Sequence, residues 1–67
     1  MMTLYEFIKY EGLKRNLSIR DLAAEAALTY PTIYRLKKKE PSRQTYYKLS
    51  KFLDVTIAEL LEYPILK

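Results

Sequence analysis

The sequence predicts an all-α fold in which five short helices form one compact bundle. Three observations support this prediction. Apolar residues recur at the i, i+3, i+4 and i+7 spacing of one helix face, a Ser or Thr stands at or just before the start of each such stretch, and no stretch alternates polar and apolar residues over the length of a strand. With 67 residues, the chain is expected to form a single domain, residues 1–67, around one small core.

The first helix is predicted over residues 3–15, where Leu4, Phe7 and Ile8 form an apolar stripe. Gly12 falls late in this helix and should weaken it by roughly 1 kcal/mol relative to alanine. The cations of this helix are expected on its outer side: Lys9, Lys14 and Arg15. Three tyrosines at helical spacing are expected at half-buried edges of the core: Tyr5, Tyr10 and Tyr46.

The second and third helices are predicted over residues 18–26 and 29–38, joined by a tight turn. Ser18 and Thr29 can each accept free backbone N–H groups at the start of a helix. Pro31 falls in the first turn of the third helix, where no N–H is required. Two helices joined so closely must share a core and lie at a fixed angle. Their apolar positions are Ile19, Leu22, Ala23, Ala26, Leu28, Ile33 and Leu36.

The fourth and fifth helices are predicted over residues 43–53 and 56–62. The proline within residues 40–42 breaks the chain before the fourth helix, because proline disfavours helical geometry in the residue that precedes it. Ser42 is the expected cap. Thr56 and the glutamate three residues later form a capping box for the fifth helix.

The composition argues against catalysis. The chain has no Cys and no His, so disulfides and Cys/His zinc sites are excluded, and general bases are limited to carboxylates, Lys and Tyr. The acidic residues are scattered, and the single glycine excludes a glycine-rich phosphate loop. We therefore expect no enzyme activity, no catalytic residue, no metal, no cofactor and no small-molecule ligand.

No apolar run approaches the ~20 residues of a membrane span, and no signal peptide is visible. The absence of cysteine fits a reducing compartment. The sequence therefore predicts a cytoplasmic protein without a membrane partner.

Positive charge gathers in one part of the chain. The net charge is +4, yet residues 30–51 hold seven cations and one acid, which gives that stretch +6 and leaves −2 for the remainder. A polyanion would be drawn to one side of such a molecule; the alternative is an ordinary solvated basic surface. The outer face of the predicted third helix suits a DNA major groove, with Tyr30, Thr32, Tyr34, Arg35 and Lys38.

Taken together, the second to fifth predicted helices resemble the Cro/C1-type helix-turn-helix domains of phage and bacterial repressors. The residues that carry the resemblance lie in SIRDLAAEAALTYPTIYRLKK and its continuation PSRQTYYKLSKFLDVTIAELL. The resemblance spans roughly residues 4–61 and implies a lambda repressor-like DNA-binding fold. The matching positions are Leu22, Ala23, Leu28, Thr29, Thr32, Ile33, Pro41, Ser42, Thr45, Leu49, Leu53, Val55, Thr56, Glu59 and Leu60.

The resemblance implies that the third helix is the recognition helix, whose N-terminal side chains meet base edges. Arg35 would then grip guanine O6 and N7. The base-contacting residues would be Tyr30, Pro31, Thr32, Tyr34 and Arg35. Phosphate contacts, which position the domain without reading sequence, would come from Ser18, Ile19, Arg20, Thr29, Lys37, Lys38, Arg43 and Gln44. The structural alternatives are that Thr29 and Pro31 only start their helix and that the lysines form a solvated helix end.

The chain departs from the family pattern at several positions. Ala27 stands where the family usually has a glycine in the turn, which predicts a mildly strained backbone. Gly12 and Lys37 replace an arginine and a glutamate that often form an ion pair. Glutamines that often read bases are replaced by Ile19, Tyr30 and Pro31. The fold assignment survives these changes, but the operator sequence is not predictable.

The leading interpretation is a small sequence-specific transcriptional regulator, Cro- or repressor-like, that binds double-stranded DNA as a homodimer in a bacterial cell or phage-infected bacterium. The alternative is a helix-turn-helix module that binds a protein, as an antirepressor, antitoxin or recombination accessory factor. The candidate dimer surface is the fifth helix and the tail, with Leu61, Tyr63, Ile65 and Leu66. Equally, the apolar tail can fold back over the core of its own monomer.

Overall fold

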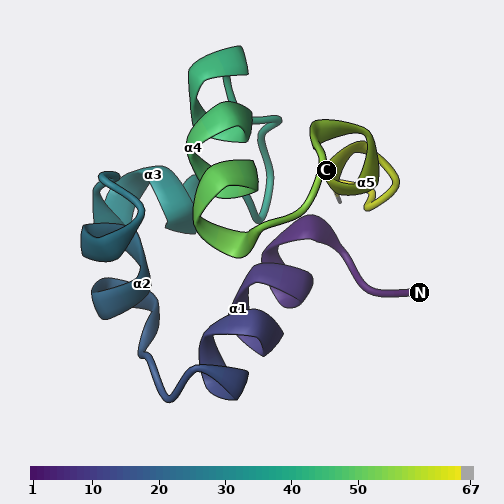
Figure 1. Cartoon of the computed structure of the whole chain (residues 1–67). Helices are drawn as coiled ribbons and strands as arrows, with labels where there is room; N and C mark the ends of the chain where they lie inside the picture. The colour runs from purple at the N-terminus through teal and green to yellow at the C-terminus, as the bar shows by residue number, and fades with distance from the viewer. Residues whose placement is uncertain (66–67) are drawn as a thin grey trace.

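The computed structural model of this chain describes residues 1–65, and within them all regular structure is α-helical, which confirms the predicted fold class (Figure 1). The Cα radius of gyration is 10.5 Å. No helix of the described residues is long and apolar enough to cross a membrane. The five helices are α1 (Leu4–Lys14), α2 (Ile19–Glu25), α3 (Tyr30–Arg35), α4 (Arg43–Leu53) and α5 (Ile57–Leu61).

Each helix begins at a hydroxyl side chain. The four predicted caps all accept a backbone N–H from the residue three positions later, and Thr3 does the same for α1. α5 has the predicted capping box, and α1 has a second one formed by Thr3 and Glu6. Because each cap satisfies an otherwise unpaired donor and is worth about 1 kcal/mol, these residues fix where the short helices start.

α3 is shorter than the predicted span of residues 29–38. It ends at Arg35, and the following residues turn more tightly. Leu36, Lys37 and Lys38 each donate their N–H to the carbonyl three residues earlier, at 3.0–3.2 Å, so the last turn leaves the α-helical pattern. The lysine run therefore lies on a turn instead of extending α3.

The core lies between the helices and contains one apolar side of each. Its fully buried side chains include Leu4 and Ile8 from α1, Leu22 from α2, Ile33 from α3 and Leu49 from α4. Tyr46 is buried with them at 8% exposure, and Tyr5 is half-buried. The expectation of a half-buried position was wrong for Tyr10, which is 49% exposed on the outer side of α1.

Gly12 has a packing role that the sequence did not reveal. It is buried in α1, and a Cβ atom there would lie 3.1 Å from the Leu17 carbonyl oxygen and 3.2 Å from a Leu22 methyl. Gly12 therefore allows the chain that leads into α2 to approach α1 closely, in addition to its intrinsic weakening of the helix.

The C-terminal segment returns to the start of the chain. Leu4 donates its N–H to the Pro64 carbonyl at 3.0 Å, and the rings of Phe7 and Tyr63 stack with centroids 4.2 Å apart. Ile65 is half-buried against the core. Of the candidate dimer residues, Tyr63 and Ile65 therefore pack within the monomer, Leu61 is 59% exposed, and Leu66 lies outside the described residues.

A buried carboxylate and its arginine partner connect the end of α1 to the end of α4. Glu11 is only 7% exposed and accepts hydrogen bonds from Arg15 at 2.7 Å and Lys14 at 3.1 Å. The Arg15 guanidinium, expected on the outside, also donates to the Leu53 carbonyl at 3.4 Å. Burial raises the pKa of Glu11, but Arg15 and Lys14 outweigh it and hold that pKa below its ordinary value of 4.5.

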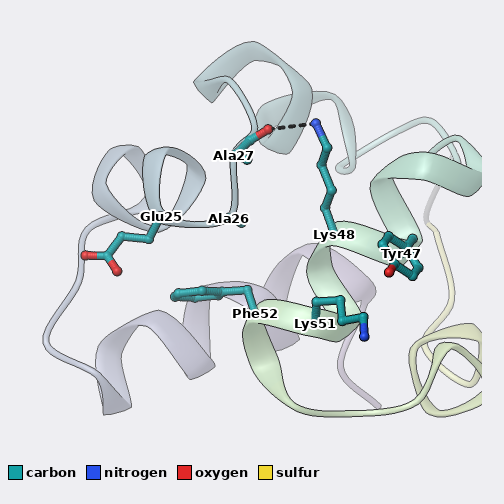
Figure 2. Close-up of a pocket in the computed structure, with 7 residues that line it drawn as sticks. All are labelled: Glu25, Ala26, Ala27, Tyr47, Lys48, Lys51 and Phe52. Carbon is teal, nitrogen blue, oxygen red and sulfur yellow. Dashed lines mark hydrogen bonds between the residues drawn. The ribbon is translucent and has the colours of Figure 1, made fainter.

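The turn between α2 and α3 places a non-glycine residue in the left-handed region. Ala27 has φ 60°, as do the more tolerant Asn16 at 60° and Asp54 at 58°. Leu28 donates its N–H to the Ala23 carbonyl at 2.7 Å, and the Lys48 ammonium donates to the Ala27 carbonyl at 2.9 Å (Figure 2). The strain expected at Ala27 is therefore present as a positive φ angle, and Lys48 of α4 stabilises the turn through its hydrogen bond.

Replacing Ala27 with glycine should raise the free energy of unfolding by about 0.5–1 kcal/mol, because glycine removes the Cβ clash at positive φ. Asn16→Gly is the matched control and should change stability less, since asparagine tolerates this conformation. Urea unfolding of both variants measures the difference. Equal effects of the two substitutions would contradict the assignment of strain to Ala27.

Glu11→Gln should lower the free energy of unfolding by about 1 kcal/mol near neutral pH, through weaker hydrogen bonds to Arg15 and Lys14. Because the pKa of Glu11 is lower in the folded than in the unfolded state, its ion pairs stabilise the fold fully above the unfolded-state pKa. This stabilisation is lost as the pH falls through the folded-state pKa. The difference from the wild type should therefore shrink below pH 4.5.

Urea unfolding of the wild type and Glu11→Gln between neutral and acid pH tests this. Glu62→Gln serves as the control, because Glu62 is exposed and forms no salt bridge within residues 1–65. A difference between the wild type and Glu11→Gln that stays constant with pH would show that the ion pairs of Glu11 do not stabilise the fold.

Candidate nucleic-acid interface

The buried side of α3 decides which of its residues face solvent. Ile33 is fully buried and Leu36 is 2% exposed, and both belong to the core next to α2. Pro31, Tyr34 and Arg35 are therefore exposed. Tyr30 and Thr32 are half-buried at the edges of this surface. The residues predicted to contact bases thus all retain accessible surface on one short helix.

Three tyrosine rings and two cations lie in contact along this surface. The Tyr30 and Tyr34 rings, one helical turn apart, have centroids 5.9 Å apart. The Arg20 guanidinium carbon lies 4.4 Å from the Tyr30 centroid, and the Lys37 ammonium lies 4.6 Å from that of Tyr34 and 5.0 Å from that of Tyr5. We call these five residues the aromatic–cation row. Contacts of this length are attractive because the ring face is electronegative.

The aromatic–cation row includes Tyr5, which the sequence analysis did not predict as part of this surface, and it gives Lys37 contacts beyond the predicted one with phosphate. Tyr5 comes from α1, and no spacing rule connects it with α3, so only the fold could bring it to Lys37. Lys37 was predicted to contact phosphate, but its ammonium lies between two tyrosine rings. The contact between the Tyr30 and Tyr34 rings could have been found from the sequence, because residues at i and i+4 lie on the same side of a helix.

A basic hollow of about 370 Å³ adjoins the end of α3. Its lining consists of Tyr34 and four cations, with no acid; the cations are Arg35, Lys37, Lys38 and Lys39. A second hollow of about 230 Å³ lies between α3 and the start of α4; Arg35 and Lys39 line both hollows, and the acidic Glu40 lines only the second. Lys39 was not among the predicted phosphate contacts, although it belongs to the same lysine run. The concentration of positive charge makes this region attractive to phosphates.

Most of the predicted phosphate contacts are exposed, but several have structural partners. The Ser18 and Thr29 hydroxyls accept the N–H groups of Asp21 and Thr32, and the Thr29 hydroxyl also lies 2.8 Å from that of Thr32. The Ile19 side chain packs against the core, so a phosphate could meet only its backbone. The exposed cations and amide of this set are Arg20, Lys37, Lys38, Arg43 and Gln44.

A further hollow of about 330 Å³ lies between the α2–α3 turn and α4 (Figure 2). Its rim carries Lys48, Lys51 and Glu25, and Phe52 and Tyr47 supply aromatic surface. Lys48 is already bonded to the Ala27 carbonyl. The hollow therefore has mixed charge, and one of its lysines already bonds the turn, whereas every charged residue of the hollow beside Arg35 is a cation. Within residues 1–65, no three acidic groups lie close enough to hold a metal ion.

A small helical domain with an exposed helix after a tight turn, surrounded by cations, has the architecture of a helix-turn-helix DNA-binding domain. The family model of the Cro/C1-type HTH DNA-binding domain matches residues 13–64. The chain therefore belongs to the Cro/C1-type helix-turn-helix family, as the resemblance predicted. Comparison with curated proteins and with solved structures gave no match.

Proposed function

We propose that the protein is a small sequence-specific transcriptional regulator that inserts α3 into the major groove of an operator. The observation that carries this proposal is the combination of the exposed Tyr34 and Arg35 on α3 with the uniformly basic hollow beside them. Membership of the Cro/C1-type family supports DNA as the polyanion.

Base reading is assigned to the exposed side of α3. Arg35 would donate two hydrogen bonds to O6 and N7 of a guanine. Pro31 and the methyl group of Thr32 would contact thymine methyl groups, and Tyr30 and Tyr34 would meet bases or sugars. Phosphate contacts would come from Lys38, Lys39, Arg43 and Gln44, with the backbone at Ile19 and the Ser18 and Thr29 hydroxyls at the edge of the groove.

Replacement of Arg35 should change sequence preference, whereas replacement of Arg43 should not. Arg35→Ala should lose about 1–3 kcal/mol of discrimination at one base pair of the selected site. Arg43→Ala, the matched control, should weaken binding to all sequences about equally and reduce the dependence of affinity on salt. Selection from a genomic fragment library at roughly 50 and 200 mM salt measures both effects.

Two results would contradict this assignment. Equal, weak and salt-sensitive binding to all fragments by both the wild type and Arg35→Ala would show that the basic surface is only electrostatic. Absence of DNA binding, together with salt-insensitive capture of a protein partner, would favour the alternative interaction module.

We also propose that the protein binds as a homodimer, because helix-turn-helix proteins of this kind read two half-sites about one helical turn apart. Leu61 on α5 supports this proposal because it is 59% exposed, while the neighbouring Tyr63 and Ile65 pack against the monomer. α5 is therefore the proposed centre of the contact, and the tail contributes less than its sequence suggested.

Leu61→Glu should weaken binding to a selected two-half-site DNA at least about tenfold, because charge at an apolar contact opposes dimerisation. Binding to a single half-site should be unchanged. Leu13→Glu is the control, since Leu13 is 68% exposed on α1. Sedimentation of each protein–DNA complex gives its stoichiometry, and a two-to-one complex with Leu61→Glu at wild-type affinity would exclude α5 as the interface.

A further inference from the structure

The Arg20 side chain contacts α3 through the aromatic ring of Tyr30. It is the second residue of α2, and Tyr30 is the first residue of α3. The distance of 4.4 Å from the guanidinium carbon to the Tyr30 centroid is the shortest cation–ring distance within residues 1–65. The contact therefore places a cation from α2 at the N-terminal end of α3.

The hydrogen-bond donors of Arg20 are available. Within the described residues, the Arg20 guanidinium makes no side-chain hydrogen bond and no salt bridge, and the residue is exposed. Arg15 offers the contrast, because its guanidinium donates to Glu11 and to the Leu53 carbonyl. A guanidinium that lies over a ring uses its face for that contact and keeps the N–H groups at its edge for a ligand.

The position of the ring favours a base over a phosphate as that ligand. The first residues of a recognition helix are those that approach base edges in the major groove, and Tyr30 holds Arg20 there. The contact also orders a side chain that would otherwise have many rotamers, which suits the fixed geometry of two hydrogen bonds to one base. A backbone phosphate makes no such demand and is bound well by a mobile cation.

The sequence around α3 favours guanine as that base. Residues 18–39 contain neither Asn nor Gln, the side chains that read adenine through paired hydrogen bonds. The arginines of this stretch are Arg20 and Arg35, and arginine pairs with guanine O6 and N7. Arg20 is held beside the first residue of α3 and Arg35 is its last residue, so the two lie towards opposite ends of the helix.

We propose that Arg20 reads a guanine in each half-site, with Tyr30 as the positioning residue that holds it, in addition to the guanine read by Arg35. This inference rests on the proposed sequence-specific DNA binding. It replaces the expectation that Arg20 contacts a phosphate. It also gives Tyr30 a role that depends on its ring and not on its hydroxyl group.

Selection from a randomised DNA library, followed by affinity measurements on the selected site, tests the proposal with five proteins. They are the wild type, Arg20→Ala, Tyr30→Leu, Tyr30→Phe and Arg43→Ala. Arg20→Ala should reduce the preference for one guanine about 5- to 150-fold. Tyr30→Leu should reduce the preference at the same position, and Tyr30→Phe should retain it because the ring remains. Arg43→Ala should weaken binding to all sequences about equally and leave the base preference at every position as in the wild type. Thermal unfolding confirms that each variant is folded.

The outcomes separate this inference from the proposed function. A wild-type motif that Arg20→Ala keeps intact, with weaker binding to all sequences, would make Arg20 a phosphate contact and overturn the inference alone. Loss of the guanine preference in Tyr30→Phe as well as in Tyr30→Leu would overturn the role of the ring. Enrichment of no sequence by the wild type would contradict the proposed function, and the assignment of Arg20 with it.

Discussion

The geometry of the turn between α2 and α3 is the constraint on which the remainder of the site depends. Ala27 adopts a left-handed conformation that alanine disfavours, so surrounding contacts must hold it. The Leu28 N–H bonds to the Ala23 carbonyl from within the turn, and Lys48 bonds to the Ala27 carbonyl from α4. With the turn fixed, Ile33 enters the core and the opposite side of α3 must face solvent.

A contact between a cation and two rings lies at one of the positions where many members of the resembled family form an ion pair. The positions that often carry an arginine and a glutamate are Gly12 and Lys37 in this chain. Gly12 permits a close approach between α1 and the segment before α2, and Lys37 lies between Tyr5 and Tyr34. α1 is thus connected to the end of α3 through a shared ammonium group, with no buried ion pair to desolvate.

The Arg15 guanidinium, paired with the Glu11 carboxylate, makes the corresponding connection between α1 and α4. The two cationic partners of Glu11 satisfy its carboxylate at the edge of the core, and Arg15 extends the contact to the Leu53 carbonyl. α4 supplies Lys48 to the turn before α3, so the contacts that hold the end of α4 and those that hold this turn involve the same helix.

Much of the fold was predictable from local sequence. Helix caps depend on one hydroxyl and a backbone N–H three residues away, and Ser18, Thr29, Ser42 and Thr56 all take that role. The end of α3 was predicted less well, because the lysine run has good helix propensity but the chain must turn towards α4. The exposure of Tyr10 and the burial of Glu11 also depended on neighbours that lie far away in the sequence.

The sequence alone determined the helical class, the order of the helices, the family pattern and the candidate recognition residues, because these follow from short-range spacing. Only the tertiary structure could bring Arg20 to Tyr30, Tyr5 to Lys37 and Lys48 to Ala27. These pairs come from different helices or from a helix and a distant turn, and the packing of the core sets their distances. That packing brings the Arg20 guanidinium to the Tyr30 ring at the start of α3, and it stacks Tyr63 on Phe7 of the same monomer.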